Sequence, residues 1–306
     1  MLNLLLFQQI AKLFILIFLG WAIVKAGILK SEDSKTLSMI LLYIITPCVC
    51  ISGFQVERTA ENSQMVELAL LSALVMNGLC ILLGALAARL FHLDVVEEAS
   101  IQYPNAGNLI IPLVSSIFGS EWVMYVTVYA MIQTILDWTH ARILISGKKE
   151  ISLRDLVCNV NILAIMLGLF LFIFQLRLPT VIGSAFSMAG DTIGPVAMLI
   201  TGMLMAGIDM QRLRSYRQIW KPVLLRLIVL PVILVCVAKY SGLVALAPHG
   251  ETLIIISLLS VIAPSANIVT QFSQMFGRDA LYASLINTVT MLLCIITMPL
   301  MITLFQ

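Results

Sequence analysis

The sequence predicts an all-α integral membrane fold, with ten transmembrane helices in two inverted five-helix repeats. Three observations support this prediction: an apolar composition, ten apolar stretches of spanning length, and an uneven distribution of Lys and Arg. Apolar residues make up 60% of the 306 positions, and Asp, Glu, Lys and Arg only 11%, whereas soluble domains carry about 25% charged residues. Because so few charges do not cover the surface of a soluble fold, lipid is expected to be the solvent.

Ten stretches are long and apolar enough to cross a hydrocarbon core, which takes about 20 residues. The first is expected to be a retained span, because the N-terminus lacks the basic region and the cleavage site of a signal peptide. Short loops join the stretches, so one membrane domain is expected. The predicted spans are 4–24, 36–54, 66–90, 97–118, 121–146, 156–176, 181–208, 218–240, 251–274 and 280–304.

The basic residues of the loops predict the orientation of these spans. Cytoplasmic loops are enriched in Lys and Arg. With both termini outside, the external loops hold three basic residues, Arg58, Arg177 and Lys239. The cytoplasmic loops then hold thirteen: Lys25, Lys30, Lys35, Arg89, Arg142, Lys148, Lys149, Arg154, Arg212, Arg214, Arg217, Lys221 and Arg278. The asymmetry predicts that the N- and C-termini are both outside.

The chain divides near its middle into two predicted repeats, 1–147 and 148–306. The most polar connection, SGKKEISLRD, leaves five spans on each side. An odd number of spans makes the second half enter the membrane in the opposite orientation, which is the condition for an inverted repeat. The fourth span reads YPNAGNLIIPLVSSIFG and the ninth APSANIVTQFSQMFG. Each has a proline, small residues and asparagine ahead of an apolar run, so the two are expected to correspond.

These two spans are predicted to be broken helices that cross and form a binding site. Pro104 and Pro264 remove backbone donors within them. Unpaired backbone is tolerated at membrane depth only inside protein or beside a water-filled cavity. A half-helix N-terminus favours an anion, and the amides of Asn105, Asn108 and Asn267 are candidate ligands for a carboxylate. The alternative is that each Asn only bonds a neighbouring helix.

Asp137 is the ionisable residue whose position within a predicted span most requires an explanation. It lies in the fifth span, in MIQTILDWTHAR, with Gln133 four residues before it and His140 three after. An ionised Asp at the centre of a spanning helix costs roughly 2.5–3.5 kcal/mol. One interpretation is a coupling-ion or proton site beside the substrate. The other is that the span ends early and Asp137 reaches the cytoplasmic interface, where it pairs with Arg142.

Two other charged residues have weaker interpretations. Asp191 precedes Pro195 in GDTIGP, so it is a candidate to cap the half-helix after a break, to bind a coupling cation, or to sit at the interface of a tilted span. Arg226 lies within the eighth span and is expected to snorkel to the headgroups.

The chain shows no constellation of an enzyme. It has no G-x-S-x-G, H-E-x-x-H or phosphate-binding loop. No catalytic residue, metal site or cofactor is therefore expected. A formal charge of +2 gives no reason to expect nucleic acid as a partner.

The motifs resemble those of a known family. NAGNLIIPLVSSIFG is similar to the fourth-span motif of the auxin efflux carrier family, and PSANIVTQFSQMFGRDALYASLINTVTMLLCIITMPLM to its last two spans. GWAIVKAGILKSEDSKTLSMILLYIITPCVC resembles the opening hairpin of that family. The similarity extends over nearly the whole chain. Because plant members carry a long hydrophilic central loop and this chain only SGKKEISLRD, it resembles the short microbial type.

The resemblance implies a fold and a function. It implies that spans four and nine cross, and that a small organic anion binds there by Pro104, Pro264 and the asparagines, with Gln133 facing the site. Spans 1, 2, 6 and 7 would form a scaffold, and spans 3–5 and 8–10 a moving transport unit. Plant members carry indole acetate, and bacterial members are assigned to malonate, malate and similar acids. A secondary carrier in the bacterial inner membrane, driven by protons or sodium and dimeric through its scaffold, is therefore expected.

Two alternatives remain open at this point. A sodium-coupled symporter of a related crossed-helix family would use Asp137 and Asp191 as cation ligands. A membrane sensor or scaffold would keep the fold without transport.

Overall fold

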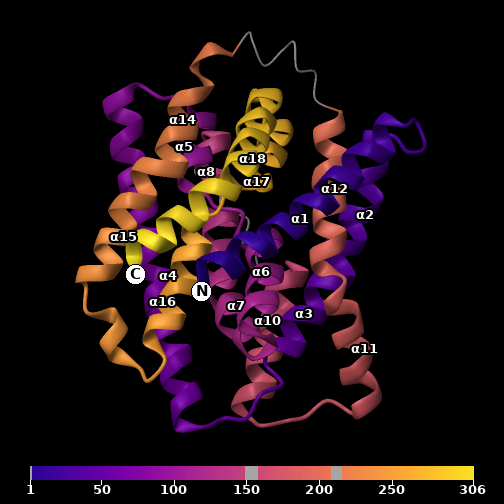
Figure 1. Ribbon diagram of the computed structural model, residues 1–306, viewed down its shortest axis with the longest axis vertical. Coiled ribbons are helices and arrows are strands. Elements are labelled where there is room, and N and C mark those ends of the chain that lie inside the picture. The colour runs from indigo at the N-terminus through magenta and orange to yellow at the C-terminus, as the bar shows by residue number, and fades with distance from the viewer. Residues whose placement is uncertain (1, 149–157, 208–215) are drawn as a thin grey trace. The chain divides into compact units, whose positions relative to one another are not determined.

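The computed structural model describes residues 2–148, 158–207 and 216–306, and within these ranges the protein is built from helices (Figure 1). The ten apolar ranges each contain helix in the described residues. Two shorter apolar helices are Val160–Ile173 and Gly250–Val261. Among the described residues, five helical stretches are individually long and apolar enough to cross a membrane: Ser31–Gly53, Ala60–Phe91, Thr180–Ala206, Trp220–Tyr240 and Ala280–Phe305. The prediction of an all-α integral membrane protein is therefore confirmed.

The residues fall into two compact units, and each predicted repeat contributes to both. Unit 1 comprises Met1–Ser63, Gly107–Thr127 and Val157–Ile208. Unit 2 comprises Gln64–Ala106, Val128–Leu156 and Asp209–Gln306. Since the chain crosses between the units several times, helices distant in sequence share one packed core within each unit.

Unit 1 is held by close helix packing at glycines. Gly20 and Gly202 let α1 and α12 approach so closely that a Cβ on Gly202 would lie 1.9 Å from the Ile17 carbonyl oxygen. In Figure 1, α1 crosses α12. Helices α10 and α11 both pack on α3. The helices of this unit are α1 (Leu2–Lys25), α2 (Ser34–Ile40), α3 (Thr46–Gly53), α6 (Ile111–Phe118), α10 (Val160–Ile173), α11 (Thr180–Asp191) and α12 (Ile193–Ala206), with the 3-10 turns η1 (Ser31–Asp33) and η4 (Ser120–Trp122) and the π-helical η2 (Leu41–Ile45).

Unit 2 is organised around α18, which packs on α5, α15 and α17. Its helix α5 begins at a capping box, because Asp94 accepts from the Glu97 backbone N–H while the Glu97 carboxylate accepts from that of Asp94. The other helices are α4 (Ala60–Phe91) and α7 (Val123–Leu136), whose first turns lie in unit 1, α5 (Val95–Gln102), α8 (Arg142–Ser146), α14 (Trp220–Leu224), α15 (Leu230–Tyr240), α16 (Gly250–Val261), α17 (Asn267–Met275) and α18 (Ala280–Phe305). Short turns are the π-helical η5 (Asp137–Ala141) and η7 (Leu225–Val229) and the 3-10 turns η6 (Arg217–Ile219) and η8 (Leu243–Leu246).

Proline explains most of the π-helical turns. Pro47, Pro112 and Pro231 each follow a π-helical turn by two residues, those turns being η2, η3 (Ala106–Ile110) and η7. Proline offers no N–H to the carbonyl four residues earlier, so the preceding turn widens. Turn η5 is the exception, because no proline follows it. Its widening therefore has another cause, and it contains Asp137.

Candidate functional site

The candidate site lies in unit 2, where two broken helices pair through their backbones. Helix α5 ends before Tyr103, and α17 begins after Ala266. The two extended segments lie antiparallel: the Asn105 N–H donates to the Pro264 carbonyl oxygen at 2.8 Å, and the Ala266 N–H donates to that of Tyr103 at 2.9 Å. Because Pro104 and Pro264 break their helices, the freed backbone groups of each segment are satisfied by the other. This pairing is called the crossover below.

Side chains from two other helices bond the remaining backbone groups of the crossover. Gln133 on α7 donates through Nε2 to the Pro104 carbonyl. On α18, Asn287 donates to the Ser265 carbonyl, and Thr290 accepts from the Ser265 N–H at 3.1 Å. Gln133 was predicted to face the site and does contact the crossover, while Asn287 and Thr290 were missed. Their spacing of three in the apolar stretch LINTVTML is the signal that marks one polar helix face.

Several buried polar atoms of unit 2 have no hydrogen-bond partner among the described residues. Five of them come from the crossover and from the fifth predicted span, and the side chains of Asn105 and Gln133 are each only 5% exposed. These five atoms are Asn105 Nδ2, Ser265 Oγ, Tyr129 Oη, Gln133 Oε1 and Asp137 Oδ1. An unpaired buried polar group costs about 1–3 kcal/mol. Such a set beside a helix break is typical of a place where a ligand completes the hydrogen bonding.

Asp137 lies between two residues that contact the first broken segment. Four residues before it, Gln133 bonds the Pro104 carbonyl. Three residues after it, His140 Nδ1 lies 2.5 Å from the Tyr103 hydroxyl oxygen. The Asp137 Oδ1 atom is buried and has no hydrogen-bond partner among the described residues. The π-helical turn η5 turns Asp137 and His140 relative to the helix before them, and such turns are frequent at functional sites.

The three asparagines predicted to bind a carboxylate lie in three different places in the structure. Asn105 is buried in the crossover. Asn267 is the first residue of α17 and half-buried, and Ala266 before it provides no side-chain cap. The N-terminal N–H groups of α17 therefore keep their positive partial charge. Asn108 lies in η3, and its side chain is outside the described part of the structure.

The sequence-based expectation for Arg226 is wrong. Instead of snorkelling to the headgroups, its side chain is 0% exposed and bonds carbonyl groups at the ends of α5 and α16. A long side chain within a span reaches the interface only where no closer polar partner exists. Here the broken helices supply carbonyl partners, and the sequence alone did not show that Arg226 would be beside them.

Unit 1 contains a separate cavity, which Asp191 lines. Its volume is about 480 Å³. Asp191 is exposed at the end of α11, and Thr192, not Asp191, occupies the N-cap of α12. The capping hypothesis for Asp191 is therefore wrong, because the Thr192 hydroxyl bonds back to Ala189 and no side chain caps α12. The polar residues around the cavity are Ser52, Gln55, Ser115, Glu121, Arg177, Ser187 and Asp191.

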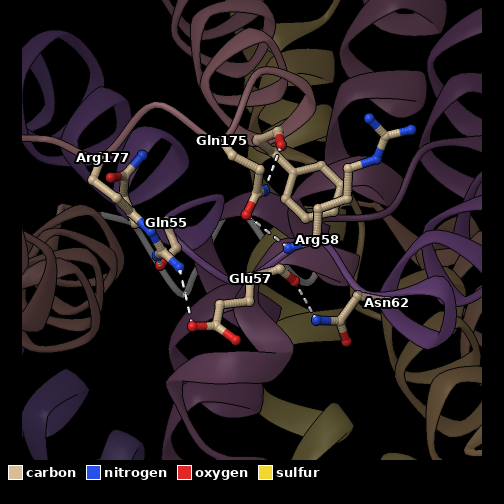
Figure 2. A network of polar contacts seen from close by, with 7 residues as sticks. Gln55, Glu57, Arg58, Asn62, Gln175 and Arg177 are labelled. Carbon is tan, nitrogen blue, oxygen red and sulfur yellow. Dashed lines mark hydrogen bonds and ion pairs between the residues drawn. The ribbon is translucent and has the colours of Figure 1, made fainter.

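A polar network closes one end of unit 1, where it joins the loop after α3 to the loop after α10 (Figure 2). The Arg58 N–H donates to Gln175 Oε1 at 3.0 Å, and the Leu178 N–H to Gln55 Oε1 at 2.8 Å. Arg177 bonds the Gln55 carbonyl and lies 4.0 Å from the Glu57 carboxylate. Arg58 and Arg177, both predicted to lie in external loops, thus each bond to the other of these two loops.

Comparison with known families identifies the family to which this helical membrane protein belongs. A family model described as "Membrane transport protein" matches residues 5–153 and again residues 149–302. The chain belongs to this family, the auxin efflux carrier family, as the sequence motifs indicated. It is also 25% identical over 153 residues to the "Uncharacterized transporter C5D6.04" of Schizosaccharomyces pombe, a match that covers 42% of this chain and 33% of the relative. The chain thus spans about a third of the length of this curated relative.

Proposed function

We propose that this protein is a secondary active transporter of small organic anions, such as carboxylates, that works by alternating access around the crossover. The observation that carries the proposal is the set of unpartnered buried polar atoms at two paired helix breaks. Family membership supports transport rather than catalysis. A substrate bound at the crossover supplies the hydrogen bonds that these atoms lack. Binding and release therefore change the free energy of the two paired segments.

The chemistry of the crossover favours an anion. The N-terminus of α17 offers free N–H groups and about half a positive charge. Asn105 has a free amide donor, and the amide of Asn267 begins α17. A carboxylate accepts hydrogen bonds at both oxygens, so it matches several donors pointing at one place. Pro104 and Pro264 hold the backbone in the extended conformation that exposes these groups.

The proposed mechanism assigns different roles to the helices. The first, second, sixth and seventh spans serve as a scaffold, and the third to fifth and eighth to tenth form the moving unit. The grouping of α1, α3, α10 and α12 in unit 1 and of α15–α18 in unit 2 supports this division. The two inverted repeats, 1–147 and 148–306, would supply the symmetry from which inward- and outward-open states arise. A homodimer through the scaffold completes the proposal.

Transport assays with purified protein in proteoliposomes test the proposed function. Labelled malonate, malate and other small carboxylates are offered with and without a proton or sodium gradient. We expect saturable uptake of at least one acid, driven by one of the gradients. No uptake of any acid under any gradient contradicts a carboxylate carrier and favours a sensor that retains the fold.

Asn267→Leu tests the substrate site directly. The change removes an amide at the N-terminus of α17 but keeps the helix, so affinity for the transported acid should fall about tenfold, the loss of one charge-assisted hydrogen bond. Binding is measured by scintillation proximity, and folding by size-exclusion chromatography. The control is Asn62→Leu, which removes a half-buried amide in the first turn of α4, in unit 1, where it bonds the Glu57 carbonyl. Equal affinity in Asn267→Leu and wild type removes Asn267 from the site.

The membrane orientation gives a further prediction. We propose that both termini face outside and that the membrane is the bacterial inner membrane, because thirteen of the loop cations then lie in the cytoplasm against three outside. Single cysteines engineered near residues 2 and 306 should react with an impermeant maleimide in intact cells. A cysteine at Lys35, in a predicted cytoplasmic loop, should react only after permeabilisation. The reverse pattern refutes this topology.

A sodium-coupled symporter is the second candidate. The observation that favours it is the buried, unpartnered Oδ1 of Asp137, since carboxylate oxygens are hard ligands suited to small cations. Asp191 is the other candidate ligand and lines the unit 1 cavity. Replacing the sodium gradient by a pH gradient separates the two: a symporter of this type loses driven uptake, whereas a proton-coupled carrier keeps it.

A further inference from the structure

A fully buried arginine stands at the crossover outside the proposed substrate contacts. Arg226 is on the π-helical turn η7, which precedes Pro231, and its side chain is 0% exposed. Removing a guanidinium from water costs several kcal/mol unless it is fully hydrogen-bonded. Arginine is rarely neutral in proteins, so this side chain carries a permanent positive charge. The partners of the guanidinium therefore indicate what the charge does.

The guanidinium bonds the ends of both half-helices that lead into the crossover. Nη2 donates to the Val261 and Ala263 carbonyl oxygens at 2.6 Å each, and Nε donates to that of Ala263 at 2.9 Å. Nη1 donates to the Ile101 carbonyl oxygen at 3.0 Å and lies 3.4 Å from Cys80 Sγ. Val261 is the last residue of α16, and Ile101 is next to last in α5. One side chain thus ties two helix C-termini together.

The charges of these groups nearly cancel. Each helix C-terminus carries roughly half a negative charge, from carbonyls with no N–H partner. Two such ends amount to about one negative charge, which the single positive charge of Arg226 balances. The N-terminus of α17 has no such counter-charge from a capping side chain. With Arg226 in place, the crossover is therefore left with the positive partial charge of α17.

We propose that Arg226 is the positioning residue of the crossover and sets its electrostatic sign: it pins the C-termini of α5 and α16 and neutralises them, so that the site accepts an anion. This inference rests on the proposed anion carrier for its biological meaning, but the charge balance is independent of any substrate. Arg226 touches no substrate in this scheme. It acts through the carbonyls of residues that flank Pro104 and Pro264.

The hydrogen-bond geometry at the two helix ends requires an arginine, whereas the sign of the local electrostatic potential depends only on the positive charge. Its planar fork bonds three carbonyls, two at the helix ends and that of Ala263 just beyond α16, which a lysine ammonium with three donors on one atom does not reproduce. Arg226→Lys should therefore keep the electrostatic sign and loosen the segments. Arg226→Gln should reverse the sign, because two negative helix ends then lose their counter-charge.

Thiol labelling measures this sign without a substrate. The reporter is Asn267→Cys at the N-terminus of α17, in a background where the three cysteines that are not buried, Cys48, Cys158 and Cys236, are serine. The other three are buried and remain. Rates are compared for an anionic methanethiosulfonate, the sulfonatoethyl reagent, and a cationic one, the trimethylammonium-ethyl reagent. Their ratio, corrected for the parent protein without the reporter, reports the local potential.

In Arg226→Gln, the ratio should shift towards the cationic reagent by about tenfold, because the loss of one unit of positive charge acts oppositely on the rates of the two reagents. Arg226→Lys should keep the wild-type ratio. The matched control is Arg278→Gln, which removes an arginine that bonds the Ile145 carbonyl at the end of α8, also in unit 2. We expect no shift there.

An unchanged ratio in folded Arg226→Gln overturns the proposal and leaves Arg226 a purely structural residue. If that variant does not fold, Arg226→Lys decides: a wild-type ratio supports the proposal, and a shift towards the cationic reagent overturns it. A tenfold shift without uptake of any carboxylate would support the role of Arg226 and contradict the proposed substrate. Uptake of a carboxylate without a shift in the reagent ratio would contradict the role of Arg226 and support the proposed substrate.

Discussion

Asp137→Asn is expected to lower gradient-driven uptake at least tenfold while exchange of substrate across the membrane survives. Asp137 supplies the one carboxylate among the unpartnered atoms described around the crossover, and its Oδ1 is buried. An ionised Asp there is costly unless a cation or a proton accompanies it. An asparagine fixes the neutral state, so the site still binds its substrate but no longer couples binding to the gradient.

The measurement is uptake and counterflow in proteoliposomes, wild type against variant, across pH and sodium gradients. The matched control is Glu32→Gln, which changes an exposed carboxylate of unit 1. Thermal stability provides a second readout. Since the amide removes an uncompensated charge, Asp137→Asn should melt no lower than wild type. Equal driven rates with the same pH dependence in both proteins would end the coupling hypothesis and return Asp137 to the role of an interface residue.

Gly202→Ala is expected to cost the most stability of any single-methyl change at the described glycines. The added Cβ would lie 1.9 Å from the Ile17 carbonyl oxygen and 2.8 Å from the Trp21 nitrogen. Both are backbone atoms, so α1 and α12 must separate. Overpacking typically costs 1–3 kcal/mol, occasionally more, which lowers Tm by about 2–12 °C in a chain of this size. Thermal melts followed by fluorescence-detected size exclusion measure the shift.

Gly78→Ala is the matched control and should change stability in the opposite direction. Gly78 lies within α4, and a Cβ there meets nothing within 4 Å. Alanine is favoured over glycine inside a helix by about 1 kcal/mol, so the variant should melt slightly higher. If Gly202→Ala melts like wild type, α1 and α12 are not packed as closely as their glycines indicate.

Much of the fold could be predicted because its causes are local. The run of apolar residues makes a helix in lipid, and Pro104 and Pro264 end helices without reference to anything distant. Asn105 was placed near the break by the same local logic, and Gln133 by the family resemblance; both lie at the crossover. The Asp94 capping box and the widened turns before Pro47, Pro112 and Pro231 are local too.

The errors concern partners that are far away in sequence. Arg226 was expected at the headgroups because within its own span it has no polar neighbour, whereas its carbonyl partners are 35 or more residues away. Capping of a helix was one of three interpretations of Asp191 that the local sequence allowed, but Thr192 occupies the N-cap of α12 instead. Asn287 and Thr290 were missed for the same reason.

By itself the sequence determined the class of this protein: a helical membrane chain with a proline break in each half, and motifs of the auxin efflux carrier family. Only the tertiary structure decided that the two breaks bond each other, that one arginine binds both helix ends, and that Asp137 lies on a turn widened without proline. The physical reason is that a chain's hydrophobicity and backbone restrictions act on neighbouring residues. The compensation of a buried charge or carbonyl depends on which distant segment the fold brings beside it.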